Sequence, residues 1–256
     1  MFDNTVSRFN PGVTNSRDTG LLSDLYVNNR IDRIHEYPQD FDQFVAADWV
    51  VTGAGTAALT AGDGGILLLT TTASTFESVQ KTPAAFPMTK GLRSWFTAQV
   101  QVDNVLGLLI AGLLNATATP FTGASQTDGA YFLSTNTGAL SFNVAVGGVI
   151  ASVNLGVSLV AGAIANANLS FYWDGGCYAA APLGRVVFEA SGAGVTANVR
   201  GEIAVPASGT IAAFPGAVNL APIFGVSAST AAVRTAVIDK LYAAKDEVNI
   251  NATPAF

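Results

Sequence analysis

The chain has 256 residues, enough for one sizeable hydrophobic core without disulfide bonds. Its single cysteine, Cys177, cannot form an internal bridge. The net charge of −6 and the absence of any run of Lys or Arg exclude a protein that binds nucleic acid by neutralising the phosphate backbone. We therefore expect no nucleic-acid partner.

Charged residues are scarce throughout the chain. They make up 12% of the sequence, against about 25% in an average soluble domain. Between Asp103 and Asp174 the only charged residue is Asp128. Other subunits could cover this part of the surface, because the cores of interfaces are depleted in charge. A neutral but well-hydrated surface of Ala, Thr, Asn, Ser and Gly would give the same composition, and both explanations stay open.

Residues 1–40 differ in composition from the rest of the chain. They hold a large share of the charged residues and the only histidine, His35. Ser23 or Asp24 could cap one short helix, but the apolar stripe that would follow is weak. The segment has too little hydrophobic periodicity to form a core of its own, which predicts an irregular arm that becomes ordered by lying on another surface.

The N-terminus has neither a basic stretch nor an apolar stretch of the kind found in secretory signals, so we expect synthesis in the cytoplasm. The most hydrophobic run, residues 105–114, is about half the ~20 residues that a membrane helix needs. It predicts a buried strand pair or a bend, and no membrane partner.

From Phe41 onward, short β-branched and aromatic stretches alternate with Gly, Asn, Asp and Ser. A Trp-Val-Val-Thr run at 49–52 precedes Gly53, and residues 66–71 predict a buried strand. Residues 95–102 alternate with a period of two, which is typical of a half-buried strand. A further strand, 130–133, follows the turn at Asp128-Gly129.

The clearest local signal spans residues 140–155. Leu140, Phe142, Val144 and Val146 alternate with small or polar residues before Gly147-Gly148, and a second alternating run follows. A Gly-Gly pair between two such runs predicts a two-residue hairpin with positive φ at both turn positions.

The remaining expected strands complete an all-β sandwich, because turn signals recur about every 8–12 residues. Residues 231–245 have a composition that would also suit a helix. The alternation of Val233, Thr235, Val237, Asp239 and Leu241 favours a strand there. The other expected strands are 169–173, 185–190, 195–203 and 223–226.

One short motif fits a nucleotide-binding fingerprint. Gly53-Ala54-Gly55-Thr56-Ala57-Ala58 matches G-x-G-x-x-G/A, but that site needs a helix after the glycines. Glycines at 62, 64 and 65 interrupt the chain instead, and the same pattern recurs at 192–197. We expect no cofactor.

The sequence also shows no sign of catalysis. The single histidine, His35, lies in the expected arm and is more typical of a surface or interface residue than of a catalytic base. The five glutamates, at 36, 77, 189, 202 and 247, are isolated along the chain. Asp63, Asp128 and Asp174 each adjoin glycine, which is typical of turn formers. We expect no catalytic residue and no metal site. The tryptophans and tyrosines of the strands are expected mainly in the core, although they could form a platform on which sugars stack.

The order of these features resembles concanavalin A-like jelly-roll proteins of tailed-bacteriophage virions. The resemblance covers about residues 42–245 and rests on Phe44, Trp49, the strand at 65–72, and the runs at 95–98, 107–108, 128–132, 169–175, 221–224 and 237–241. It implies an N-terminal arm over 1–40, a jelly-roll sandwich over 41–248 and a C-terminal tail over 249–256. The metal-binding and sugar-binding residues of the lectins with this fold have no clear match.

The resemblance implies a capsid decoration, or cement, protein. Such a protein binds the major capsid protein on the outer surface of the virion, often as a homotrimer. The arm is then the expected contact, through Phe2, Arg8, Phe9, Arg17, Leu21, Leu22, Leu25, Tyr26, Ile31, Arg33 and Ile34. The alternative is a carbohydrate-binding adhesin of the tail or virion surface that recognises a host glycan. A glycan-cleaving enzyme is a third, less favoured class.

Overall fold

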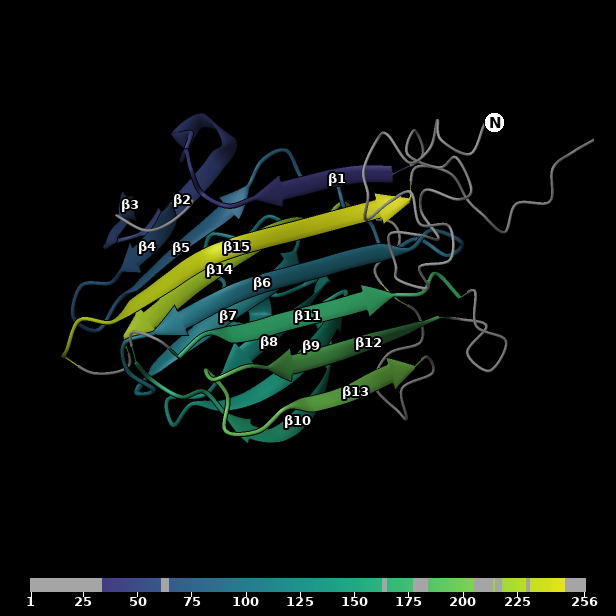
Figure 1. Ribbon diagram of the computed structural model, residues 1–256. Helices are drawn as coiled ribbons and strands as arrows, with labels where there is room; N and C mark the ends of the chain where they lie inside the picture. Colours follow the sequence, from purple (N-terminus) through teal and green to yellow (C-terminus); the bar gives the residue numbers. More distant parts are fainter. Residues whose placement is uncertain are drawn as a thin grey trace, which may run out of the picture.

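A computed structural model describes residues 34–60, 65–162, 165–176, 184–204, 214, 218–228 and 231–246. In these ranges the protein is a sandwich of two antiparallel sheets, as the alternating sequence predicts (Figure 1). Its only described helical turns are η3 (Ala46–Asp48) and η4 (Gly123–Ser125). The all-β fold is confirmed.

One sheet has eight strands and the other has seven. The eight-stranded sheet runs in the order β13 (Val199–Ala204), β12 (Arg185–Ser191), β11 (Ala167–Trp173), β6 (Ser94–Val102), β15 (Thr235–Asp246), β4 (Ile66–Thr70) and β3 (Thr56–Thr60), with β1 (Ile34–Gln39) also paired to β15. The seven-stranded sheet runs in the order β10 (Val149–Ser158), β9 (Ala139–Val146), β8 (Gly129–Ser134), β7 (Gly107–Leu114), β14 (Ala221–Ala228), β5 (Phe76–Lys81) and β2 (Trp49–Gly53).

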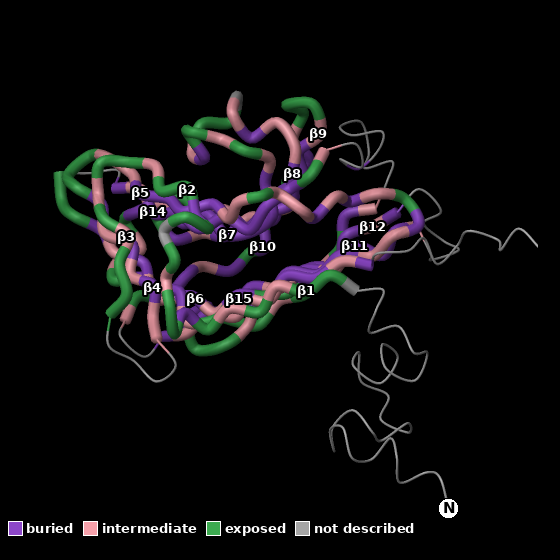
Figure 2. The backbone as a smooth tube through the Cα atoms, turned by 90° about the horizontal axis from the view of Figure 1, so that it is seen from above, coloured by how far each residue is buried: buried purple, intermediate pink, exposed green. Residues whose placement is uncertain are grey.

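A stack of phenylalanines between the sheets forms the centre of the core. Phe142 on β9 lies 4.6 Å, ring centre to ring centre, from Phe188 on β12 and 5.4 Å from Phe171 on β11. Phe96 on β6 similarly lies 6.0 Å from Phe224 on β14. Each pair joins one sheet to the other, so aromatic packing sets the separation of the two layers. Figure 2 shows the buried residues gathered between the layers.

Local patterning predicted several strands correctly. In β6, Phe96, Ala98 and Val100 are fully buried, whereas Thr97 is exposed. The hairpin of β9 and β10 pairs Val146 with Val149, and its turn glycines, Gly147 and Gly148, have φ values of 56° and 83°. The expected positive φ at both positions is confirmed.

The expected facing of the last strand is only half right. Residues 235–246 do form a strand, but Ala236 and Ile238 are the buried residues of its first half, rather than Val237. The pairing with β6 shifts register between Ile238 and Lys240, a bulge that exchanges the two faces. Leu241 is therefore buried as expected.

Two other expectations change. Residues 107–114 form one strand, β7, and neither a strand pair nor a bend. The strand expected over 195–203 begins only at Val199, and Val195 makes a single isolated bridge to Leu159.

The described part of the expected arm is also not irregular. Residues 34–39 form β1, which pairs in register with residues 241–246 of β15. Within the described residues the sandwich thus begins at Ile34 and not at Phe41. Residues 1–33 lie outside the described ranges.

The two glycines of the fingerprint-like motif mark the point where the chain crosses between the sheets. Gly53 ends β2, and Thr56 begins β3 in the other sheet. A Cβ on Gly53, whose φ is +140°, would lie 2.2 Å from the carbonyl oxygen of Phe76, and one on Gly55 would lie 1.9 Å from that of Thr70. Close backbone approach requires these glycines.

The phenylalanine stack provides a direct test of the core. We expect Phe142→Ala to lower the free energy of unfolding by about 3–5 kcal/mol, because it leaves a cavity among rings of both sheets. Chemical denaturation measures this change. The matched control is Val149→Ala, since Val149 is 48% exposed at the hairpin turn, and it should change stability by less than about 0.5 kcal/mol. Equal effects of the two substitutions would contradict this account of the core.

Candidate functional site

The segment 115–128, between β7 and β8, covers part of the outer face of the seven-stranded sheet. Beneath it lies a second hydrophobic cluster, separate from the main core, of Ile110, Leu114, Tyr131, Ala145 and Ile223, with Phe121 of the segment packed against it. The ring of Phe121 also lies 6.0 Å from that of Phe76 on β5. β7 is therefore apolar on both faces, because one face meets the main core and the other meets this segment.

The segment is fixed at its start by one buried side chain of β5. The Gln80 side-chain amide donates to the carbonyl oxygens of Leu114 and Asn115, both at 2.9 Å, and its oxygen accepts the Thr117 N–H at 3.2 Å. Gln80 is only 7% exposed. This side chain therefore joins β5 to the end of β7 and to the start of the segment.

The segment is fixed again at its end. The Tyr131 hydroxyl donates to Gln126 Oε1 at 2.8 Å, and the Gln126 amide donates to the Pro120 carbonyl oxygen. Burial raises the pKa of Tyr131, so this hydroxyl keeps its proton and remains a donor. Asp128 accepts the Gly147 N–H at 3.1 Å, which ties the segment to the β9–β10 turn. Segment 115–128 is thus a preorganised loop.

A shallow hollow of about 330 Å³ lies beside this loop. It is lined by the strands β2 and β5 and by the start of the loop, through Val50, Thr52, Gln80, Thr117, Ala118 and Ala221 among others. Val50 is 52% exposed. The lining offers hydroxyl and methyl groups, because the amide of Gln80 is bonded to the loop backbone. The cation in the lining, Lys81, donates to the neighbouring carbonyl oxygen of Thr82 at 2.8 Å. A neutral ligand, or the neutral surface of another protein, fits this chemistry.

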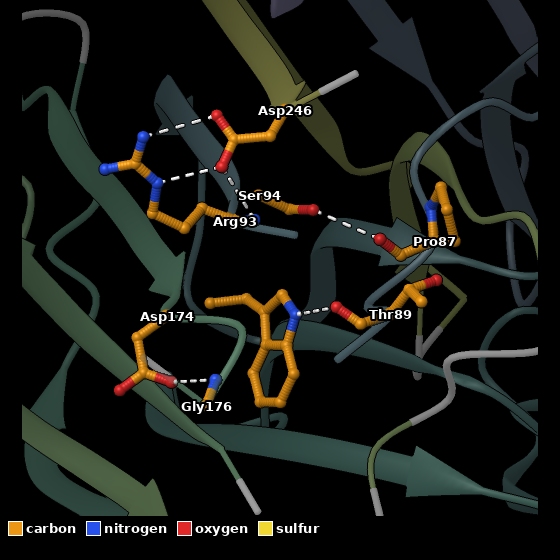
Figure 3. A network of polar contacts seen from close by, with 8 residues as sticks. Pro87, Thr89, Arg93, Ser94, Asp174, Gly176 and Asp246 are labelled. Carbon is orange, nitrogen blue, oxygen red and sulfur yellow. Dashed lines mark hydrogen bonds and ion pairs between the residues drawn. The ribbon is translucent and has the colours of Figure 1, made fainter. Parts of the chain in front are cut away.

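The clearest polar network lies at the end of the sandwich where β6, β11, β12 and β15 meet (Figure 3). Arg93 Nε binds Asp246 Oδ2 at 2.8 Å, and Arg185 Nε binds Asp174 Oδ2 at 2.9 Å. Asp174 also accepts the Gly176 N–H at 2.9 Å. Both aspartates are about 3% exposed.

This network holds loops in place. The Ser94 hydroxyl donates to the Pro87 carbonyl oxygen at 3.2 Å, and the Trp173 indole N–H donates to that of Thr89 at 3.3 Å. The sequence predicted Asp174 as a turn former, and its bond to Gly176 fits that role. The pairing of Asp174 and Glu202 through Arg185 was not predicted, since these residues are far apart in the chain. Because arginines neutralise these acids, the arrangement does not supply a free acid–base pair.

The buried carboxyl group of Glu77 lies under the crossing at Gly53–Gly55. Glu77 is 1% exposed, and its Oε2 accepts the Gly55 N–H at 2.8 Å. Burial raises the pKa of Glu77 above its ordinary value of 4.5, and the hydrogen bond from Gly55 opposes this shift. The sequence contains no signal for this role, because Glu77 is isolated along the chain.

Of the candidate contact residues, Phe2 to Arg33 lie outside the described residues. Only Ile34 is placed, at the start of β1 and paired with Asp246. Its expected role in an arm contact stays a prediction. Cys177 and Tyr178 also fall outside the described ranges.

The aromatic residues lie mostly as expected. Trp49, Trp95, Trp173 and Tyr131 are buried, at 5%, 6%, 1% and 0% exposure, so they do not form an exposed sugar-stacking platform. Tyr172 is partly exposed on the outer face of the eight-stranded sheet, 5.6 Å from the ring of Trp95.

Among the described residues, no three His, Cys, Asp or Glu side chains gather as metal ligands would. Within the same ranges, no helix has the length and hydropathy needed to span a bilayer.

Neither a protein-family model nor a curated protein matches the sequence. Solved structures match the fold at low identity. Lectin II from Ulex europaeus is 13% identical with a TM-score of 0.54, and the match covers 83% of this chain and 98% of the lectin. The winged bean acidic lectin, in complex with methyl-α-D-galactose, is 10% identical with a TM-score of 0.53, over 83% and 98%. A protein of unknown function from Shewanella oneidensis MR-1 is 13% identical with a TM-score of 0.50, over 93% and 98%.

These likenesses show a concanavalin A-like jelly roll, the fold class that the sequence pattern implied. They concern the fold alone.

The anchoring of the loop by Gln80 can be tested directly. We expect Gln80→Leu to lower the free energy of unfolding by about 1–3 kcal/mol, because two carbonyl groups and one N–H lose their partner. Amide hydrogen exchange across 115–118 should accelerate more than exchange elsewhere. The control is Gln99→Leu, which removes a partly exposed amide on the other sheet. Unchanged exchange at 115–118 in Gln80→Leu would show that the loop is held by other contacts.

The raised pKa of the buried Glu77 carboxyl group predicts a pH dependence of stability. Because the pKa of Glu77 is higher in the folded state, stability should fall as the pH rises from about 4.5 through that raised pKa. Glu77→Gln keeps an acceptor for Gly55 and should flatten the fall. Denaturation curves measured across this pH range test the prediction, with exposed Glu189→Gln as control. An unchanged pH dependence in Glu77→Gln would refute it.

Proposed function

We propose that this jelly roll is a structural binding module of a tailed-phage virion that decorates the outer capsid surface. The observation that carries the proposal is the lack of charge over a long stretch of the chain, whose exposed residues include Ala116, Ala118, Thr119 and Thr122 of the loop. From Val105 to Trp173 the chain has one charged side chain, Asp128, and that carboxylate accepts the Gly147 N–H. Surfaces with so few charges are typical of interface cores.

The preorganised loop supports the same proposal. It is held by Gln80, Gln126 and Asp128, so binding to it costs little ordering entropy. On a capsid the same contact repeats at every symmetry-related position. Many modest contacts then add up to stable attachment, particularly where subunits also touch each other. The major capsid protein is the proposed partner and the virion surface the proposed location.

The proposal is tested on particles of the source phage. Electron micrographs of heads with and without the protein should differ by an added outer layer. Heads without it should lose DNA at a lower temperature. Identical images and identical release of DNA would overturn the proposal.

The arm has a separate test. Because β1 begins at Ile34, deletion of residues 2–33 should leave the sandwich folded, with an unchanged circular dichroism spectrum. We expect the shortened protein to lose capsid binding, since the arm contributes contact area beyond the globular footprint. Co-sedimentation with undecorated heads measures this, with the full chain as the control. Full occupancy by the shortened protein would show that the arm is not the attachment device.

A glycan-binding adhesin is the second candidate, and the hollow beside the loop favours it. Its threonine hydroxyl groups are of the kind that hold neutral sugars in protein sites. We expect Val50→Arg to abolish any binding seen on a glycan array, because the new side chain would fill the hollow. Val149→Arg adds the same charge at another exposed position and should leave binding intact. An array with no bound glycan would remove this candidate.

A further inference from the structure

The strands β2 and β3 leave one side of the sandwich with open edges. β2 ends the seven-stranded sheet and β3 ends the eight-stranded sheet, so among the described residues each has a neighbour on one side only. The Gly53–Gly55 crossing joins them, and Figure 2 shows this side largely exposed. No residue from 49 to 60 is charged.

Aliphatic side chains on these two strands are poorly covered. Val50, Val51 and Leu59 are 52%, 45% and 41% exposed. Leu59 pairs with Leu67, which is fully buried, so Leu59 lies on the core-facing side of its strand and is still not enclosed. The core is thus incomplete at this edge.

The other described sheet edges carry devices that hinder pairing with another strand. β1 has exposed Glu36 and Pro38, and β13 has exposed Arg200 and Glu202. β10 is interrupted by a register shift between Asn154 and Ser158. Charges, proline and bulges are the usual protections of an edge strand. Within the described ranges β2 and β3 have none of them.

The sequence of β3 is complementary to itself in antiparallel pairing. With Ala58 at the two-fold axis, Thr56 would lie opposite the partner's Thr60, and Ala57 opposite the partner's Leu59. Small residues meet at the centre and threonines meet at the ends, with no like-charge pair. An identical patch that fits itself is the requirement for a two-fold interface.

We propose that β3 is a self-association edge, at which a second copy of this chain extends the eight-stranded sheet across a two-fold axis. Two copies that each carry a net charge of −6 repel one another, and a neutral contact strip minimises that cost. Asp42 and Asp48 lie on the segment that precedes these strands and are exposed, and Asp48 lies 3.8 Å from Lys81 Nζ. Association should strengthen as salt screens the net negative charge of the two copies.

A five-residue strand makes a small contact, of the size found in transient complexes, which bury less than about 1,200 Å². Self-association of this kind gives dimers or even-numbered assemblies. It does not rest on the proposed capsid role, because it concerns the free protein.

The experiment is sedimentation equilibrium of the full chain from about 1 µM to about 1 mM, the range of weak contacts. The wild type should form dimers reversibly. Ala58→Lys and Ala58→Asp place like charges opposite each other and should each weaken dimerisation by at least about tenfold. Val149→Lys, which adds the same charge at the exposed hairpin turn, should dimerise as the wild type does.

Mixing the two variants gives the decisive result. The new lysine of one variant would face the new aspartate of the other across the two-fold axis, so an equimolar mixture of A58K and A58D should recover a dimer that contains one of each. The proposal is overturned if the wild type stays monomeric at the highest concentration, if it forms trimers, or if the mixture stays monomeric. A variant that dimerises normally but fails to bind heads would instead show that this edge accepts a capsid protein, which also overturns self-pairing.

Discussion

The contact between phenylalanine rings of the two sheets is the interaction on which the rest of the structure depends. Phe142 meets Phe171 and Phe188, and Phe96 meets Phe224, so each pair spans the two layers. Large rings bury much apolar area and constrain their neighbours by shape. These rings set the separation of the two layers, and the stability of the fold comes from this core. The outer faces of the sheets can therefore carry few charges.

The outer face of the seven-stranded sheet adds a second, smaller core under the loop 115–128. Its side chains are fixed by the same strands whose other faces line the main core, since the adjacent residues Leu113 and Leu114 lie on opposite faces of β7. A binding surface built on this loop therefore inherits the rigidity of the sandwich. The hollow beside it and the neutral edge of β2 belong to one continuous region, because Val50 contributes to both.

Most of the fold could be predicted from the sequence because the alternation of β6 and the Gly-Gly hairpin depend only on local chemistry. The facing of β15 could not, since the bulge at Asp239 arises from pairing with β6. The loop's role was missed because its anchors, Gln80 and Gln126, are ordinary polar residues in the sequence. The available signal in the sequence was that β7 is apolar on both faces. This pattern indicates a strand that another segment covers, and not a bend. The role of Gly53–Gly55 at the crossing between the sheets required the structure, because it depends on the backbone of Phe76 and Thr70.

The residues of the loop fall into two groups, which differ in how readily they can be replaced during evolution. Gln126 and Phe121 point inward and hold the backbone, whereas Ala116, Ala118, Thr119 and Thr122 are exposed. Exposed positions on a backbone fixed elsewhere tolerate replacement at little cost in stability. Selection can therefore change the chemistry of this surface while the scaffold beneath it stays the same, in the way that hypervariable loops diversify on a constant framework.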